Sequence, residues 1–133
     1  MPRSRPAPTT ASPAAAAARP ERWAVDAGVA DLATLHIPAD ASRRRVFDVD
    51  VRFVVRATDA HGEPWHAMTV EIDGAREWSR RIDTHRPGAT DSLDYHCRRE
   101  VAVGQALRVR VATQLSGAQR VRLSIEAEEQ PTP

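Results

Sequence analysis

Two parts of the chain alternate apolar and polar residues with a strict two-residue period, and this constrains the fold more than any other feature. The first part runs from Phe47 to Ala57, with apolar residues at every odd position and mostly Asp or Arg between them. The second comprises Leu107–Val111 and Val121–Ala127, where Arg and Glu occupy most of the gaps. Successive side chains of a β-strand point to opposite faces. The pattern therefore predicts antiparallel sheets with one buried and one solvated face.

Turn signals such as Asp73-Gly74 and Ser116-Gly117 separate further strand patterns at intervals typical of an all-β fold. The sequence predicts an antiparallel β-sandwich of six to seven strands, with a partly open β-barrel as the alternative. Residues 23–37 fit either a loose helical stripe or an irregular segment that ends in a short strand before Pro38, and we favour the second. The expected strands are Val46–Thr58, Trp65–Asp73, Trp78–Ile82, Leu107–Thr113 and Val121–Ala127, together with one that starts at Leu93–Cys97 and either continues or restarts through Val101 and Val103.

The domain organisation follows from composition. Residues 1–22 are rich in Pro and Ala and nearly free of large apolar side chains, so we expect a disordered tail. Residues 23–128 then form one β-sandwich domain, and residues 129–133 a flexible C-terminal tail. The N-terminus lacks the apolar stretch of a signal peptide, and no segment is apolar enough to insert into a membrane. We expect a cytoplasmic location, with export by a route that reads no such signal left open.

Charge and residue usage narrow the function classes. The net charge is +1, which argues against nucleic acid as a partner. All 19 basic residues are Arg, and the absence of Lys and Asn indicates a high-GC, bacterial genome. A single cysteine, Cys97, excludes an internal disulfide. Because the chain has no nucleophile elbow, phosphate-binding glycine loop or recognisable carboxylate pair, we expect a non-enzymatic protein without a cofactor.

Four arginines near the C-terminus are the first candidate binding residues: Arg108, Arg110, Arg120 and Arg122. If Ser116-Gly117 closes a three-residue hairpin, Arg110 lies opposite Arg122 and like charges repel. A register shifted by two residues places Arg108 opposite Glu126 instead. The sequence leaves both registers open. It also leaves open whether the arginines form a solvated face or bind an acidic polymer.

Trp65 and Trp78 are the second candidates. Trp65 has the opposite parity to Met68, Val70 and Ile72, which predicts that it faces outward. An exposed pair of tryptophans would suit stacking on a glycan, and the alternative is packing at the rim of the core.

A histidine and aspartate group is the third candidate, as a metal or acid–base site. Asp94 and His96 share parity on one expected strand, and His85 lies in the preceding loop. Three converging ligands are the minimum for a zinc site.

The leading functional interpretation is a soluble bacterial accessory module that binds another protein, because a complete strand pattern lacks any catalytic motif. The alternatives are an anion- or carbohydrate-binding module and a small metal-dependent enzyme. A long, uncharged edge strand would favour the first, since such an edge invites strand addition by a partner.

Overall fold

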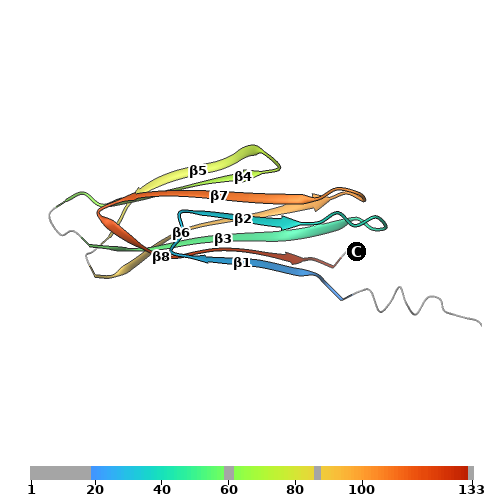
Figure 1. Ribbon diagram of the computed structural model, residues 1–133, viewed down its shortest axis with the longest axis horizontal. Helices are drawn as coiled ribbons and strands as arrows, with labels where there is room; N and C mark the ends of the chain where they lie inside the picture. Colours follow the sequence, from blue (N-terminus) through green and yellow to red (C-terminus); the bar gives the residue numbers. More distant parts are fainter. Residues whose placement is uncertain (1–18, 59–61, 86–87, 132–133) are drawn as a thin grey trace, which may run out of the picture.

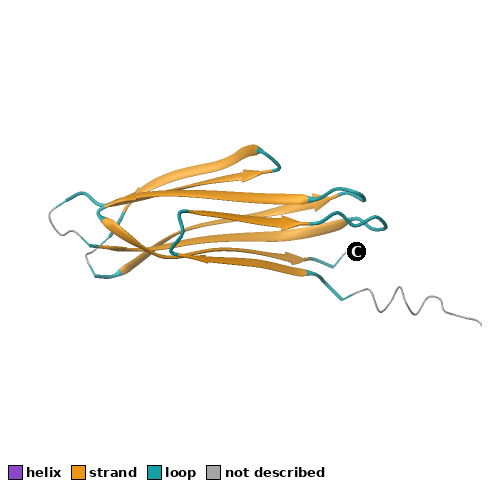
Figure 2. Ribbon diagram, viewed as in Figure 1, coloured by secondary structure: helices purple, strands orange, loops and turns teal. Residues whose placement is uncertain are grey.

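The structure is a computed structural model that describes residues 19–58, 62–85 and 88–131. In these ranges the chain forms β-strands joined by short loops, as Figures 1 and 2 show. The strands are β1 (Arg22–Gly28), β2 (Leu32–Ile37), β3 (Arg45–Ala57), β4 (Trp65–Ile72), β5 (Ala75–Asp83), β6 (Thr90–Val101), β7 (Leu107–Ser116) and β8 (Ala118–Glu129).

The strands form two four-stranded sheets, and every pairing within them is antiparallel. One sheet has the order β1-β8-β3-β6 and the other the order β2-β7-β4-β5. The expected antiparallel sandwich is confirmed, and the partly open barrel is not formed. The described part has eight strands, so the expectation of six to seven was too low.

The additional strand comes from residues 23–37, where a single short strand was expected. Instead, β1 and β2 both form there, one in each sheet. Trp23, Val25 and Ala27 of β1 pack against the core, and Ala33, Leu35 and Ile37 of β2 are buried in it. The small Ala side chains at inward positions obscured the alternation in the sequence.

The core lies between the two sheets and consists of the apolar rows that the alternation predicted. Burial of each large aliphatic or aromatic side chain contributes about 1.5–3 kcal/mol, so these rows are the main source of stability. The rows of the long strands are Phe47, Val49, Val51, Phe53 and Val55 in β3, Leu107, Val109 and Val111 in β7, and Leu123, Ile125 and Ala127 in β8.

Two turns with glycine connect the strands in different ways. Asp73 and Gly74 both have positive φ, 51° and 85°, and close the expected hairpin between β4 and β5. Ser116-Gly117 was expected to close a hairpin as well, but β7 and β8 lie in different sheets. Gly117 has φ 69°, and its C=O accepts a hydrogen bond from the Thr58 N–H, which follows β3 in the other sheet, so this connection crosses between the sheets.

The domain boundaries differ slightly from expectation. Residues 1–18, which make up most of the expected N-terminal tail, lie outside the described residues. Arg22 already belongs to β1, and Glu129 is the last residue of β8 and is buried. Within the described ranges no helix has the length and apolar character needed to span a lipid bilayer.

Candidate functional site: the uncharged edge strand

The four candidate arginines do not share a face. Arg108 and Arg110 project from the outer face of β7 in one sheet, whereas Arg120 and Arg122 belong to β8 in the other. Neither register considered from the sequence forms, because β7 and β8 do not pair. The crossover at Gly117 therefore divides the expected ladder into two separate pairs.

A β-bulge divides the second pair further. Val54 is opposite Arg122 and Val55 is opposite Arg120, so Val121 is an extra residue in β8. The bulge turns Arg120 toward the other sheet, where its Nε donates to Thr113 Oγ1 and its Nη2 to Thr113 O, both at 3.2 Å. Arg122 faces outward and pairs with Asp26 at 2.9 Å. The expectation that Val121 is a core residue was wrong, since it is 38% exposed.

Arg108 and Arg110 line a shallow hollow of about 240 Å³ together with Glu71 and Gly74. Glu71 Oε1 lies 3.9 Å from Arg110 Nη1, so a carboxylate already offsets part of the positive charge. This hollow is what the structure retains of the expected anion-binding face.

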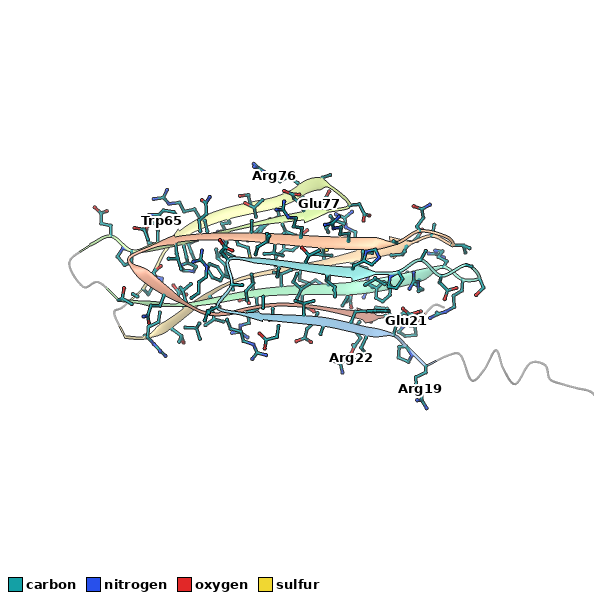
Figure 3. The ribbon with its side chains drawn as sticks, viewed as in Figure 1. Arg19, Glu21, Arg22, Trp65, Arg76 and Glu77 are labelled. Atoms are coloured by element: carbon teal, nitrogen blue, oxygen red, sulfur yellow. The ribbon has the colours of Figure 1, made fainter. Side chains whose placement is uncertain are left out.

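The two tryptophans lie apart and point in different directions. Trp65 is on the outer face of β4, as its parity predicted, and the Arg81 guanidinium carbon stacks over it 3.8 Å from the ring centroid. Figure 3 shows Trp65 at the end of the sandwich opposite Glu21 and Arg22. Trp78 packs at the rim of the core, 5.1 Å from the ring centroid of Tyr95 in the other sheet. The structure brings no pair of exposed indole rings together at these two positions.

The residues of the histidine and aspartate group do not converge on one site, because each makes its own contacts with other residues. His96 Nδ1 lies 2.9 Å from Asp50 Oδ1, and Asp94 pairs with Arg52 at 3.5 Å. The backbone N–H of His85 donates to Asp91 Oδ2 at 3.2 Å. Among the residues that the structure describes, no group of three or more His, Cys, Asp or Glu side chains is arranged to hold a metal ion.

Ion pairs also cover the outer face of the sheet formed by β1, β8, β3 and β6. Asp48 accepts a hydrogen bond from Arg98 Nε at 2.8 Å, and this bond lowers the pKa of the Asp48 carboxyl below its ordinary value of 3.8. Arg22 extends toward two carboxylates of β8, at 3.7 Å from Glu126 and 3.4 Å from Glu128. Acidic and basic side chains thus pair with each other across this face.

The edges of the two sheets remain, and they are formed by β1, β6, β2 and β5. In an antiparallel pair, alternate residues turn their backbone N–H and C=O groups toward or away from the neighbouring strand. The Thr113 N–H donates to Asp31 O at 2.9 Å, which fixes this phase for β2. Ala33, Leu35 and Ile37 therefore bond to β7, and the free edge carries the backbone groups of Leu32, Thr34 and His36.

The same reasoning shows that the other three edges carry charged side chains. The free-edge residues of β1 are Arg22, Ala24 and Asp26, those of β5 are Arg76, Ser79, Arg81 and Asp83, and those of β6 are Ser92, Asp94, His96, Arg98 and Glu100. Charged side chains and bulges are the usual protection of an edge against strand addition. β1 and β5 also contain register shifts.

β2 lacks this protection. Its sequence Leu-Ala-Thr-Leu-His-Ile contains no Asp, Glu or Arg, and its pairing with β7 is regular throughout. Leu32 at its start is 40% exposed, and Val29 in the turn before it is 69% exposed. β2 itself is thus an uncharged, regular edge, and the charged Asp31 precedes it between the exposed Val29 and Leu32.

Sequence reasoning missed this edge for a definite reason. The alternation of Ala33, Leu35 and Ile37 before Pro38 identifies a strand, but nothing local shows that β2 lies at the edge of a sheet. That position depends on the strand order, which the long-range pairing of β2 with β7 determines.

Comparison with known proteins informs the fold alone. No protein-family model and no curated protein sequence matches the chain. Among solved structures, a crystal structure of dimeric latent PorU from Porphyromonas gingivalis is similar, with a TM-score of 0.53 and 13% sequence identity. The match covers 82% of this chain and 11% of that chain, so this chain spans about a tenth of that protein. The chain is therefore similar in fold to a small part of a much larger protein.

Proposed function

We propose that this chain is a non-enzymatic protein-interaction module that binds an extended segment of a partner by adding it as a strand to β2. The observation that carries the proposal is the contrast among the four edges, because β2 is the edge without a charged side chain among its described residues. Backbone hydrogen bonds from Leu32, Thr34 and His36 would hold the added strand, and these bonds do not depend on the partner's sequence.

Specificity would come from the side chains of the added strand. Alternate residues of a strand share one face. Those on the inner side would continue the buried row of Ala33, Leu35 and Ile37, which favours apolar residues there. Side chains of the added strand that lie near the start of β2 would contact the exposed Leu32 and Val29. The expected ligand is therefore an extended peptide with apolar side chains at alternate positions.

A proline substitution in β2 tests the proposal. The Thr34 N–H points to the free edge, so Thr34→Pro removes a donor to the partner without removing a β2–β7 hydrogen bond. Ser79→Pro is the matched control, because the Ser79 N–H lies on the free edge of β5. We would select peptides on the purified chain from a displayed library of random linear peptides and measure the affinity of each variant for them.

The expected result is selection of peptides with alternating apolar residues whose affinity falls about tenfold or more in Thr34→Pro and is unchanged in Ser79→Pro. Equal binding to both variants would overturn the proposal. Circular dichroism and the melting temperature of each variant establish that it is folded.

The hollow lined by Arg108 and Arg110 supports a second candidate function, the binding of an acidic polymer. A short sulfated oligosaccharide is a suitable probe, and its affinity should fall steeply with added salt. The double variant Arg108→Ala/Arg110→Ala should lose this binding, while Arg122→Ala, in the other sheet, should retain it. Equal affinity of the double variant and the original chain for the oligosaccharide would exclude this candidate function.

A further inference from the structure

We infer that the segment added to β2 is acidic: its outward side chains beside Thr34 and His36 are Asp or Glu, and its inward side chains are apolar. This inference rests on the proposed function of the β2 edge and names the chemistry of its partner. It joins two features of the site, the free edge of β2 and the arginines on the outer face of the neighbouring strand β7. Figure 1 shows β2 and β7 side by side.

The register of β2 and β7 places two arginines next to the free-edge residues of β2. Arg110 is directly opposite Thr34, and Arg108 is directly opposite His36. Opposite residues of an antiparallel pair point to the same face, so these four side chains share the outer face of the sheet. Residues of the added strand that pair with Thr34 and His36 would point to this face as well.

The arginines are close enough to contact side chains of an added strand. Such a strand lies two strand spacings from β7, about 10 Å. Thr34 is small, so it leaves room for the long Arg110 side chain and a carboxylate side chain of the added strand to approach each other. The planar guanidinium of arginine can donate two hydrogen bonds to one carboxylate, which makes Asp or Glu the residue types that fit best.

The charge of these two arginines is only partly neutralised within the chain. Glu71 lies on the side of β7 away from β2, and its Oε1 is 3.9 Å from Arg110 Nη1. Arg108 forms no ion pair among the residues that the structure describes. By contrast, Arg52 and Arg98 on the outer face of the other sheet pair with carboxylates at 3.5 Å and 2.8 Å. The outer face beside β2 therefore remains positive and complements an acidic segment.

The charges near β2 also determine which part of the edge favours acidic residues. Asp31 directly precedes β2, next to the exposed Leu32, and its carboxylate repels another acidic side chain there. Thr34 and His36 lie farther along the strand, beside the two arginines. Every pairing in the two sheets is antiparallel. In an added antiparallel strand, the acidic residues therefore come first and an apolar residue opposite Leu32 follows.

The inner side of the added strand meets apolar side chains. Its inward residues would continue the buried row of β2, as described above. The nearest strand of the facing sheet is β1, whose Trp23 and Val25 are only partly buried against the core. Apolar inward residues of the added strand would remove more of this surface from water. The two faces of the ligand thus differ, with carboxylates outside and apolar side chains inside.

Three synthetic peptides of six residues, the length of β2, test the inference. They carry Glu, Gln or Lys at the first and third positions and Val or Leu elsewhere. Isothermal titration calorimetry with the full chain should give the highest affinity for the Glu peptide, about fivefold or more above the Gln peptide, and the lowest for the Lys peptide. Added salt should reduce these differences, because the charge pairs are exposed.

Charge reversal identifies the source of the preference. The double variant Arg108→Glu/Arg110→Glu should reverse the order, so that the Lys peptide binds most tightly. The matched control Arg52→Glu/Arg98→Glu makes the same change in net charge on the outer face of the other sheet and should keep the original order. Circular dichroism and the melting temperature verify that each variant is folded.

Thr34→Pro separates this inference from the proposed function, because it should weaken binding of the Glu peptide about tenfold or more. Equal affinity for the three peptides, no binding of any of them, or an order that Arg108→Glu/Arg110→Glu leaves unchanged overturns the inference. The proposed function then still stands if Thr34→Pro abolishes binding of the peptides selected from the library. A preference for Glu that depends on the arginines but not on Thr34 overturns both proposals and favours binding of acidic groups in the hollow beside Glu71.

Discussion

The two ends of the sandwich close the same apolar core with different chemistry. One end, which we call the ionic end, contains Glu21, Arg43, Arg45 and Glu129. The other, which we call the histidine end, contains His66 and Thr84. Each end has one buried side-chain nitrogen without a partner among the described residues, Arg45 Nε and His66 Nε2.

At the ionic end, charges are buried and paired. Arg45 is 2% exposed; its Nη1 donates to Glu21 Oε1 at 2.9 Å and its Nη2 to Pro38 O at 2.8 Å. Arg43 Nη1 donates to Glu129 Oε2 at 2.5 Å, and this hydrogen bond lowers the pKa of the Glu129 carboxyl below its ordinary value of 4.5. The Glu21 N–H also donates to Glu129 Oε1. These bonds join the start of β1 to the end of β8.

At the histidine end, the closing groups are a neutral ring and a hydroxyl. His66 is fully buried, and its Nδ1 lies 2.7 Å from Thr84 Oγ1. Its ring meets Phe53 edge to face, with 5.9 Å between centroids. Burial lowers the pKa of His66 below its ordinary value of 6.5, and the nearby charge of Asp91 offsets part of this effect.

The comparison indicates which end fails under which condition. A buried ion pair keeps its contribution to stability while both partners are charged. Removal or neutralisation of one partner leaves the other charge buried and unpaired, which lowers the free energy of unfolding strongly. A buried neutral histidine does not disturb the fold near neutral pH. In acid, the histidine of the unfolded chain binds a proton that the folded chain does not accept, so the free energy of unfolding falls. The ionic end also fixes β1 in the sheet, next to the edge strand β2, so its integrity is a condition for the proposed binding surface.

Arg45→Ala should cause the largest loss. It removes the buried donor to Glu21 Oε1 and to Pro38 O and leaves Glu21 with its partly exposed pair to Arg43, so the free energy of unfolding should fall by about 3 kcal/mol. Urea denaturation at neutral pH measures this change. The neighbouring Arg44 is the control: its side chain is 55% exposed and pairs with Glu100. Arg44→Ala should cost less than about 1 kcal/mol. Equal losses in the two variants would contradict the claim that the buried ion pairs of the ionic end stabilise the fold.

Glu129→Gln should have the next largest effect, about 2 kcal/mol at neutral pH, because it breaks a nearly buried ion pair with Arg43. The pKa of Glu129 is lowered on folding, so its stabilisation is present above 4.5 and is lost as the pH falls through the folded value. The difference between the original chain and the variant should therefore shrink in acid. Glu128→Gln, at an exposed position, should show neither effect. A pH-independent difference for Glu129→Gln would contradict the argument.

His66→Phe addresses the histidine end. At pH above 6.5 it should cost about 1–2 kcal/mol, because the buried Thr84 hydroxyl loses its partner. The original chain should lose stability as the pH falls below 6.5, since the pKa of His66 is lower in the folded state. The variant should lack this slope, which urea denaturation over a pH series would reveal. His96→Gln, at an exposed position, should retain it. Retention of the slope in His66→Phe would exclude His66 as its source.

Much of the fold was predictable because the sheet pattern is local. The alternation from Phe47 to Ala57 gave both the strand and its buried face, and Asp73-Gly74 gave a hairpin. The connection at Ser116-Gly117 was not predictable, since a hairpin and a crossover between sheets share the same local turn residues. What distinguishes them is the long-range pairing of the two strands: β7 pairs with β2 and β4, whereas β8 pairs with β1 and β3 in the other sheet.

The candidate site was harder to predict, because it depends on strand order and pairing. The sequence showed Arg52, Asp94 and His96 as charged or polar residues of two strands, but not that β3 and β6 are neighbours whose side chains pair. Which strands form edges is likewise a property of the whole sheet. A single bulge at Val121 was enough to turn Arg120 and Arg122 to opposite sides.

Substitution of these two arginines has the smallest expected effects and tests the bulge directly. Arg120 is half-buried near the histidine end and donates two hydrogen bonds to Thr113 in the other sheet, so Arg120→Ala should cost about 1–1.5 kcal/mol. Arg122 is 60% exposed in its side chain, and loss of its pair with Asp26 should cost less than about 0.5 kcal/mol. Urea midpoints of the two variants measure the difference. Strict alternation through Val121 would place both arginines on one solvated face and make the two costs equal, whereas a bulge requires them to differ.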